Sequence, residues 1–208
     1  MTGIFKIKYE PLNLLVMSEI TLKPKITLRK KSDSATFSFN ERVIVTLLWS
    51  SETDLDLCLF FKKKNGEVGG VFSDEYRQNR DDLGALNKFP FIMHSGDAKE
   101  PQPGGEESEE IKIAKLDDIA EAYVVIVNYG AAIDNEPVTF NEHSGKVILK
   151  SDTGDNLEVL ADASDKGHVY LVCSIKNDGA SKTLKNEKEV MDLGAAFSRI
   201  PGFKLICN

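Results

Sequence analysis

Tyr123-Val124-Val125-Ile126-Val127 is a continuous run of aromatic and β-branched residues. Such residues favour extended backbone, and a run without polar interruption indicates a strand that is buried on both faces. We therefore expect this strand at the centre of the fold. Further apolar runs follow with turn signals about every eight to twelve residues, as in two packed antiparallel sheets. The sequence predicts a mainly all-β fold, an antiparallel β-sandwich with one or two short helices.

Short apolar runs supply the other predicted strands. Lys64-Asn65-Gly66 separates two of them, and Asn-Gly between apolar runs is a strong hairpin signal. Residues 187–198 are predicted to form the main helix because their apolar side chains fall near one helical face. Residues 116–120 are predicted to form one helical turn. The predicted strands are residues 26–28, 36–39, 43–48, 57–61, 68–72, 90–94, 138–140, 146–149, 157–160, 168–175 and 203–207.

The densest charge in the chain lies between residues 97 and 110. Six acidic residues stand there against one lysine, a balance of −5 in a chain whose net charge is −7. Because Pro101, Pro103 and two glycines break regular structure, we expect an irregular loop that becomes a strand only at Ile111. Carboxylates held on one ordered loop repel one another unless they stay in water or share a cation. The acidic residues are Asp97, Glu100, Glu106, Glu107, Glu109 and Glu110.

Calcium suits such a loop best, since it takes about six to eight oxygens from carboxylates, backbone carbonyls and water, and magnesium is second. Asp54-Leu55-Asp56 offers another acidic pair, directly before an apolar run. In an extended segment, Asp54 and Asp56 point to the same side while Leu55 faces the core. The twelve-residue EF-hand pattern is absent from the acidic stretch. On composition and spacing alone, an acidic loop with proline and glycine is more often a solvated surface loop with no metal.

Asp54-Leu55-Asp56, followed by His94-Ser95-Gly96-Asp97 and an acidic cluster, resembles the TerD family of tellurium-resistance and stress proteins. In that family, a DLD strand start and an HTGDN...GDDE loop form calcium sites on a β-sandwich. The resemblance extends from about Ile20 to near the C-terminus. It implies a calcium-binding stress-response protein that acts as an interaction module without enzymatic turnover. It also implies partners among other stress-response proteins, including membrane-bound ones.

The resemblance implies which carboxylates are candidate calcium ligands. Within the acidic cluster, Glu107 and Glu109 fit the family register best, and the two flanking glutamates lie within one residue of it. The candidates are Asp54 and Asp56 of the DLD motif, Asp97 of the GD pair, and Glu106, Glu107, Glu109 and Glu110 of the acidic end. No residue is expected to be catalytic.

Departures from the family pattern keep two alternatives open. The family's Asn-Arg-Thr-Gly is here Ala98-Lys99-Glu100-Pro101, one acidic position is Ser108, and the upstream Trp-Asp is Trp49-Ser50. These changes favour, as the alternative function, a metal-free interaction module that has lost one or both calcium sites. A further alternative is a metal-dependent hydrolase that uses the same carboxylates to activate water.

Length and composition describe an ordinary globular chain. Its 208 residues, 41% hydrophobic and 28% charged, fit one TerD-like domain over residues 17–208. Residues 1–16 are expected to be an N-terminal extension, with an added edge strand as the alternative. The acidic balance disfavours a nucleic-acid surface, and no run approaches the roughly 18 apolar residues of a membrane span. Because residues 1–17 lack a convincing signal peptide, we expect a cytoplasmic location.

The cysteines and histidines carry no catalytic pattern. Cys58, Cys173 and Cys207 lie in apolar, strand-like runs and are expected to be reduced core thiols. His94, at the end of a predicted strand, is expected to orient the acidic loop, with a general base as the alternative. His143 belongs to no motif.

Two charged segments outside the acidic loop have simpler expected roles. The basic cluster is predicted to be a solvated face or to protect an edge strand, with binding to an acidic partner or to headgroups as the alternative. Residues 151–156 form a second acidic turn, which is expected to be a hairpin loop rather than an auxiliary cation site. The basic cluster comprises Lys23, Lys25, Arg29, Lys30 and Lys31.

Overall fold

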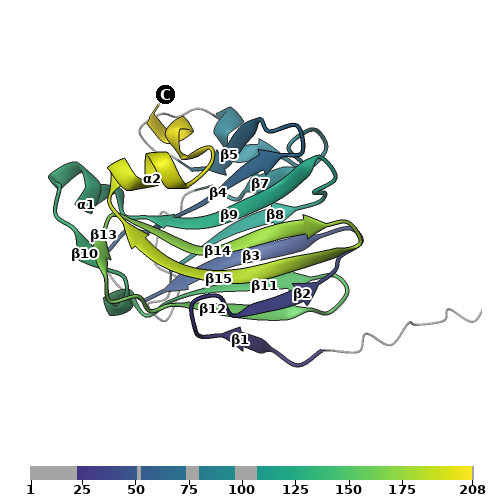
Figure 1. Ribbon diagram of the computed structural model, residues 1–208, viewed down its shortest axis with the longest axis horizontal. Helices are drawn as coiled ribbons and strands as arrows, with labels where there is room; N and C mark the ends of the chain where they lie inside the picture. The colour runs from purple at the N-terminus through teal and green to yellow at the C-terminus, as the bar shows by residue number, and fades with distance from the viewer. Residues whose placement is uncertain (1–22, 51–52, 74–79, 97–106, 208) are drawn as a thin grey trace, which may run out of the picture.

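The computed structural model describes residues 23–50, 53–73, 80–96 and 107–207, so the predicted extension 1–16 lies outside it. Two β-sheets pack against each other, and the described residues contain two short α-helices, α1 (Tyr129–Asp134) and α2 (Leu193–Arg199) (Figure 1). The prediction of a mainly all-β sandwich with antiparallel sheets and short helices is confirmed. No helix in these residues is long and apolar enough to cross a membrane.

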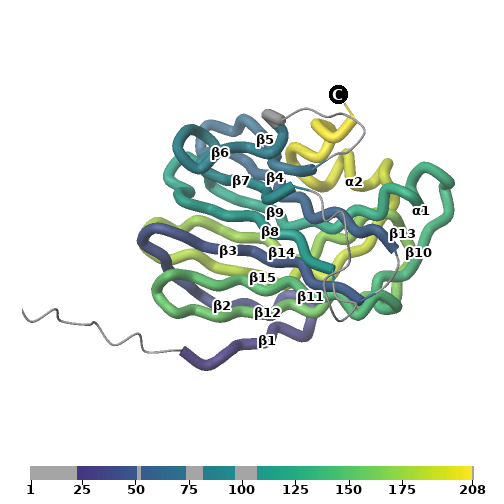
Figure 2. Tube along the Cα trace, turned by 180° about the vertical axis from the view of Figure 1, so that it is seen from behind, coloured from purple at the N-terminus to yellow at the C-terminus, as the bar shows by residue number. Residues whose placement is uncertain are grey.

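The first sheet has seven strands, and Figure 2 shows its central members side by side. Neighbouring strands are antiparallel except for the pair at one edge, where β1 runs parallel to β12. The order is β1 (Ile26–Leu28), β12 (Asn156–Ala161), β11 (Gly145–Ser151), β3 (Val43–Trp49), β8 (Glu107–Ile113), β7 (Ile92–His94) and β6 (Gly84–Ala85).

The second sheet has six strands, all antiparallel. The predicted central run lies inside it, between β14 and β4, and each residue from Val124 to Val127 is fully buried. The order is β2 (Ser34–Phe37), β15 (Ser181–Met191), β14 (Val169–Asp178), β9 (Ile119–Val127), β4 (Asp56–Lys63) and β5 (Val68–Phe72). A separate two-stranded ladder joins β10 (Val138–Thr139) to β13 (Lys166–Gly167).

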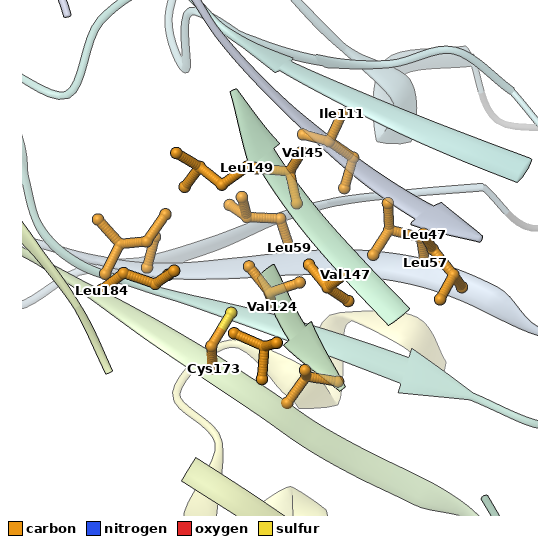
Figure 3. Packing of buried hydrophobic residues seen from close by; sticks show 14 of the residues in the cluster. Val45, Leu47, Leu57, Leu59, Ile111, Val124, Val147, Leu149, Cys173 and Leu184 are labelled. Carbon is orange, nitrogen blue, oxygen red and sulfur yellow. The ribbon is translucent and has the colours of Figure 1, made fainter. Parts of the chain in front are cut away.

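The core has two parts because β9 and β4 are buried on both faces. Between the sheets, Leu59 and Val124 of the second sheet meet Val147 and Leu149 of the first (Figure 3). On the other face of the second sheet, α2 and the 3-10 helix η3 (Phe203–Cys207) cover a smaller cluster. Residues alternate along β4 between these two clusters, as expected for a strand with side chains on both faces.

The predicted helix over residues 187–198 is wrong in its first half. Residues 187–191 belong to β15, where Val190 pairs with Tyr170 and Met191 pairs with Val169 of β14. The helix begins only at Leu193, where the Asp192 side chain accepts a hydrogen bond from the Ala195 N–H at 2.7 Å. Pairing with a neighbouring strand therefore overrides the helical spacing of the apolar residues.

Two further local predictions are wrong. Residues 203–207 form the 3-10 helix η3 rather than a strand, because Phe203 and Ile206, three residues apart, both face the second cluster. Residues 116–120 form a turn closed by a hydrogen bond from the Ile119 N–H to the Leu116 carbonyl at 3.0 Å, and β9 starts at once. The sequence did not predict α1, which the Asn128 side chain caps by accepting from the Ala131 N–H at 2.9 Å.

The three cysteines are reduced, but only two lie in the core. Cys58 and Cys173 are buried, and burial raises the pKa of the Cys173 thiol. Cys207 is exposed at the end of η3, so the prediction of a core position is wrong for this residue. Its place follows from the helical turn, which directs Phe203 and Ile206 inward instead.

Leu59→Ala tests the central packing. Leu59 is fully buried between the sheets, so truncation should lower the free energy of unfolding by about 2–5 kcal/mol through lost burial and a cavity. Urea denaturation measures the change. Ile133→Ala is the control, because Ile133 is 69% exposed and its truncation should change stability by less than about 0.5 kcal/mol. Similar losses in both variants would contradict this packing.

Candidate functional site

Two buried side chains tie the first sheet to the start of β4. Glu109 Oε2 accepts a hydrogen bond from the Leu57 N–H at 2.6 Å, and His94 Nε2 lies 2.9 Å from the Leu57 carbonyl oxygen. The two side chains lie together, with 3.5 Å between His94 Nε2 and Glu109 Oε2 and at most 1% of either side chain exposed. We call this group, His94, Glu109 and the Leu57 backbone, the Leu57 latch.

The latch exists because β5 is shorter than β4. β5 pairs with β4 only from Cys58 onward, so no β5 residue in the ladder stands opposite Leu57. Buried backbone N–H and C=O groups need hydrogen-bond partners when a neighbouring strand ends. Glu109 on β8 and His94 on β7 supply them from the opposite sheet. The latch thus takes the place of one missing strand residue.

His94 holds one defined tautomer in this arrangement. Its Nδ1 accepts a hydrogen bond from the Gly96 N–H at 3.0 Å, so the ring proton lies on Nε2, which donates to the Leu57 carbonyl. Both ring nitrogens are therefore engaged by backbone groups. The bond to Gly96 also fixes the backbone where the chain leaves β7, in line with the predicted orienting role.

The prediction that residues 107–110 belong to an irregular loop is wrong. They form the first half of β8, where Glu107 pairs with Trp49 and Glu110 pairs with Thr46 of β3. The ladder with β3 provides hydrogen-bond partners for the backbone of these residues. Along β8, Glu109 shares the inward face with Ile111, whereas Glu110 lies on the outer face. The carboxylates are thus divided between two environments instead of crowding on one loop.

The side chains of the DLD motif alternate between two faces of the chain, as predicted. Leu55 and Leu57 are buried between the sheets, which places Asp54 and Asp56 on the other face of the chain. Asp54 is exposed, and Asp56 is 7% exposed. Glu109 reaches Leu57 from β8 of the first sheet, so its carboxylate meets the start of β4 directly after Asp56. The two other candidates, Asp97 and Glu106, lie outside the described residues.

A calcium ion needs about six to eight oxygen ligands. The candidate carboxylates offer suitable donor atoms, and the latch brings the acidic stretch to the DLD motif. Among the described residues, no group of three or more histidine, cysteine or acidic side chains could hold a metal ion.

Sequence reasoning missed the latch itself. Glu109 was a candidate for its charge, but its hydrogen bond to a strand backbone was not expected. A usable signal was present, because Glu109, Ile111 and Ile113 are spaced by two and lie on the same face of a strand. The partner, Leu57, could not be found in this way, since it depends on how far β5 extends along β4.

The second acidic turn serves the structure, as predicted, by closing the β11–β12 hairpin. Asp152 accepts hydrogen bonds from the Asn40 and Glu41 N–H groups at 3.0 and 2.7 Å. Asp155 accepts from the Ser38 N–H at 3.1 Å and pairs with the Lys23 ammonium at 2.8 Å. Burial alone would raise the pKa of Asp155, but these partners outweigh it and lower the pKa.

The basic cluster follows the edge of the first sheet. Lys25 precedes the edge strand β1 and pairs with Glu158 of β12 at 2.9 Å, as Lys23 pairs with Asp155. Arg29 and Lys30 are exposed, and their backbone N–H groups donate to the Asp33 carboxylate at 3.0 and 2.8 Å. This arrangement agrees with the predicted protection of an edge strand.

Comparison with known proteins identifies a shared fold. No protein-family model and no curated protein matches the chain. Among solved structures, the chain is similar to "Crystal structure of unknown function protein SAV2460", with 15% identity and a TM-score of 0.50. The match covers 75% of this chain and 94% of that chain. At this level of identity the likeness shows the fold alone.

Glu109→Ala tests the latch. The variant leaves the Leu57 N–H without its acceptor and should lose about 1–3 kcal/mol of unfolding free energy, with a similar loss for His94→Ala. Glu110→Ala is the matched control, because Glu110 lies on the outer face of the same strand and should change stability by less than about 0.5 kcal/mol. Urea denaturation at pH 7 would separate the two positions. Equal losses at Glu109 and Glu110 would argue against the latch.

Acid titration tests the Asp155 turn. The folded pKa of Asp155 lies below the ordinary value of 3.8, so its stabilisation is complete above that value and disappears as the pH falls through the folded pKa. Wild type should therefore be more stable than Asp155→Asn at pH 6, and the difference should shrink below about pH 4. Urea midpoints from pH 6 to pH 2 measure it, with Asp134→Asn as the exposed control. A difference that stays constant with pH would contradict the assignment.

Proposed function

We propose that this protein is a calcium-binding stress-response module of the TerD type that works by binding partners and performs no catalysis. The β-sandwich supports the proposal, because it is the fold that the resemblance implies. The order of the DLD motif, His94-Ser95-Gly96-Asp97 and the acidic cluster supplies the rest. The same resemblance leads us to propose other stress-response proteins, including membrane-bound ones, as partners. The buried free thiols of Cys58 and Cys173 support the proposal of a cytoplasmic location.

One observation carries the calcium proposal. Glu109 and Leu57 are 52 positions apart, yet the Glu109 carboxylate contacts the amide that directly follows Asp56. Two motifs that are distant in the sequence are thus neighbours in space, and each contains carboxylates. A coordination shell shared by the two motifs needs such a meeting, because its ligands would come from both of them.

The proposed ligands divide between the two motifs. Asp54 and Asp56 would contribute from the start of β4, and Asp97, Glu106 and Glu107 from the acidic stretch. Glu110 lies on the outer face of β8 and is the least suited of the candidates. A bound calcium ion supplies positive charge that reduces repulsion between these carboxylates. The segment ordered in this way would present a formed surface to partners.

A metal-free interaction module is the second candidate, and the latch favours it. Glu109, one of the best-matching ligand candidates, already uses Oε2 to accept the Leu57 N–H. Ser108 stands where the family has an acidic residue. A protein that had converted one ligand into a structural hydrogen bond could keep the fold and its partner surface without calcium.

Calcium titration of the purified protein tests the proposal. Calcium should raise the melting temperature of wild type, since binding to the folded state alone contributes about 2.7 kcal/mol at 100 times Kd. The double variant Asp56→Asn with Asp97→Asn should lose both this shift and the heat measured by calorimetry. Asp134→Asn with Glu136→Gln removes the same charge from exposed positions after β9 and should bind like wild type.

The outcome separates the two candidates. If the folded wild type shows neither binding heat nor a melting shift in millimolar calcium, the result contradicts the calcium proposal and supports the metal-free module. An equal loss of binding in both double variants would show a general charge effect rather than the proposed site. Retention of the calcium shift after addition of EDTA would exclude the metal as its cause.

A further inference from the structure

The turn between β4 and β5 contains Asn65-Gly66, the one place in the sequence where asparagine precedes glycine. Two backbone hydrogen bonds close this turn, from the Gly66 N–H to the Lys63 carbonyl at 2.9 Å and from the Lys63 N–H to the Glu67 carbonyl at 2.7 Å. Asn65 and Gly66 are both exposed. We call residues 63–67 the Asn65 turn. Solvent has access to the asparagine side chain and to the peptide bond that follows it.

Gly66 leaves the peptide nitrogen after Asn65 without a shielding side chain. Its φ of 92° lies in the left-handed region that glycine adopts without steric strain. A β-carbon at Gly66 would have no heavy atom within 4 Å, so this side of the turn is open to water. Asn135 is also exposed, but the next residue is Glu136, whose side chain branches from the carbon beside the corresponding nitrogen. The two asparagines are therefore a matched pair that differs in the residue that follows.

The Asn65 side chain is held across the Gly66 peptide. Its Oδ1 accepts a hydrogen bond from the Glu67 N–H at 3.1 Å, which closes a ring of atoms that includes the Gly66 nitrogen. The Glu67 carboxylate hydrogen-bonds the Asn65 side chain in turn and pairs with Lys63. An N–H that donates to a carbonyl oxygen stabilises the negative charge that forms there when a nucleophile attacks the carbonyl carbon. The turn thus favours attack on Asn65 Cγ.

We propose that Asn65 is a site of spontaneous deamidation. Hydroxide removes the proton from the Gly66 amide, and this nitrogen attacks Asn65 Cγ and forms the N–Cγ bond of a five-membered cyclic imide. The Cγ–Nδ2 bond breaks, and Nδ2 takes a proton from water and leaves as ammonia. Water then adds to either carbonyl of the imide and opens it to aspartate or isoaspartate. The reaction consumes one water, needs no oxidant or reductant, and adds one negative charge to the chain.

One hydrogen bond opposes the reaction. The Gly66 N–H donates to the Lys63 carbonyl, and this bond must open before the nitrogen can attack. The net contribution of one such hydrogen bond corresponds to a rate about two- to tenfold lower than in an unfolded chain. The donation from Glu67 to Oδ1 acts in the opposite direction. The folded protein should therefore react within about tenfold of the unfolded rate, because no larger barrier surrounds this exposed turn.

Deamidation would loosen the β4–β5 hairpin. An aspartate places a second carboxylate beside Glu67 where the amide made a hydrogen bond, and like charges at this distance repel. Isoaspartate carries the main chain through the β-carbon, so the turn gains one backbone atom. The turn sets the register of β4 and β5, and the buried Val71 and Phe72 of β5 depend on that register. The proposal is independent of whether calcium binds.

Peptide mass spectrometry of the full-length protein, aged in EDTA at pH 6 and at pH 8, tests the site. The peptide that contains Asn65 should gain the mass that distinguishes a carboxyl from an amide, faster at pH 8 because hydroxide starts the reaction. Asn135 should react about tenfold more slowly or less, since its neighbour carries a side chain. Part of the product should accept a methyl group from an isoaspartyl methyltransferase. No conversion at Asn65, or equal conversion at Asn135, would overturn the proposal.

An unfolded sample and one variant separate the turn from the dipeptide alone. If Asn65 reacts in guanidinium chloride but more than about tenfold more slowly in the folded protein, the turn protects it and the proposal is overturned. Asn65→Gln keeps an amide but would need a six-membered ring, so this variant should lose the reaction at residue 65. Continued reaction in that variant would contradict the cyclic mechanism. In aged wild type, the amides of residues 68–70 should exchange hydrogen faster than in fresh protein, and unchanged exchange would contradict the loosening of the hairpin.

Discussion

The start of β4 imposes one constraint on the region around it, because its backbone is buried where its neighbour β5 has already ended. The Leu57 N–H and C=O must find partners, and the nearest elements are β7 and β8 of the other sheet. A carboxylate that is only 1% exposed is expensive to bury unless it accepts strong hydrogen bonds. The charge-assisted bond of 2.6 Å from the Leu57 N–H contributes to that compensation. The constraint thus explains why an acidic residue lies inside the sandwich, and why the acidic stretch meets the DLD motif.

Local sequence patterns predicted the structure correctly where the residues of a segment are enough to determine its conformation. The run Tyr123–Val127 has the composition of a strand buried on both faces, and β9 is such a strand. Asn65-Gly66 gives the hairpin between β4 and β5, with Gly66 at a φ of 92°. The alternation of Asp54, Leu55 and Asp56 gave the two faces of the DLD motif. In these cases the pattern and the tertiary environment demand the same conformation.

The errors arose where tertiary pairing decides between two conformations that the pattern permits. The apolar residues 190, 191, 193 and 197 fit a helix, but β14 was long enough to pair with the first two, so the helix was shortened. Proline, glycine and negative charge suggested a loop up to residue 110, but β3 extends to Trp49 and pairs with β8 as far as Glu107. The length of a partner strand is not a property of the segment it pairs with. For the same reason the latch could not be predicted, although the inward face of Glu109 could.

The acidic residues of this chain have different roles. The number of hydrogen-bond and ion-pair partners that the fold provides determines whether a carboxylate is structural or can bind a ligand. Asp152 and Asp155 are saturated by backbone N–H groups, hydroxyls and Lys23, which leaves them a structural role. Glu109 is likewise committed through Leu57, whereas Asp117 and Asp118 have no such partners within the described residues and line a cavity with exposed aromatic groups. A net charge of −7 therefore says little about ligand binding by itself, because partnered carboxylates contribute to it as fully as unpartnered ones. What separates a binding carboxylate from a structural one is whether folding has already compensated its lost hydration. By this criterion Glu109 has a structural role, even though it is the residue that brings the two motifs together.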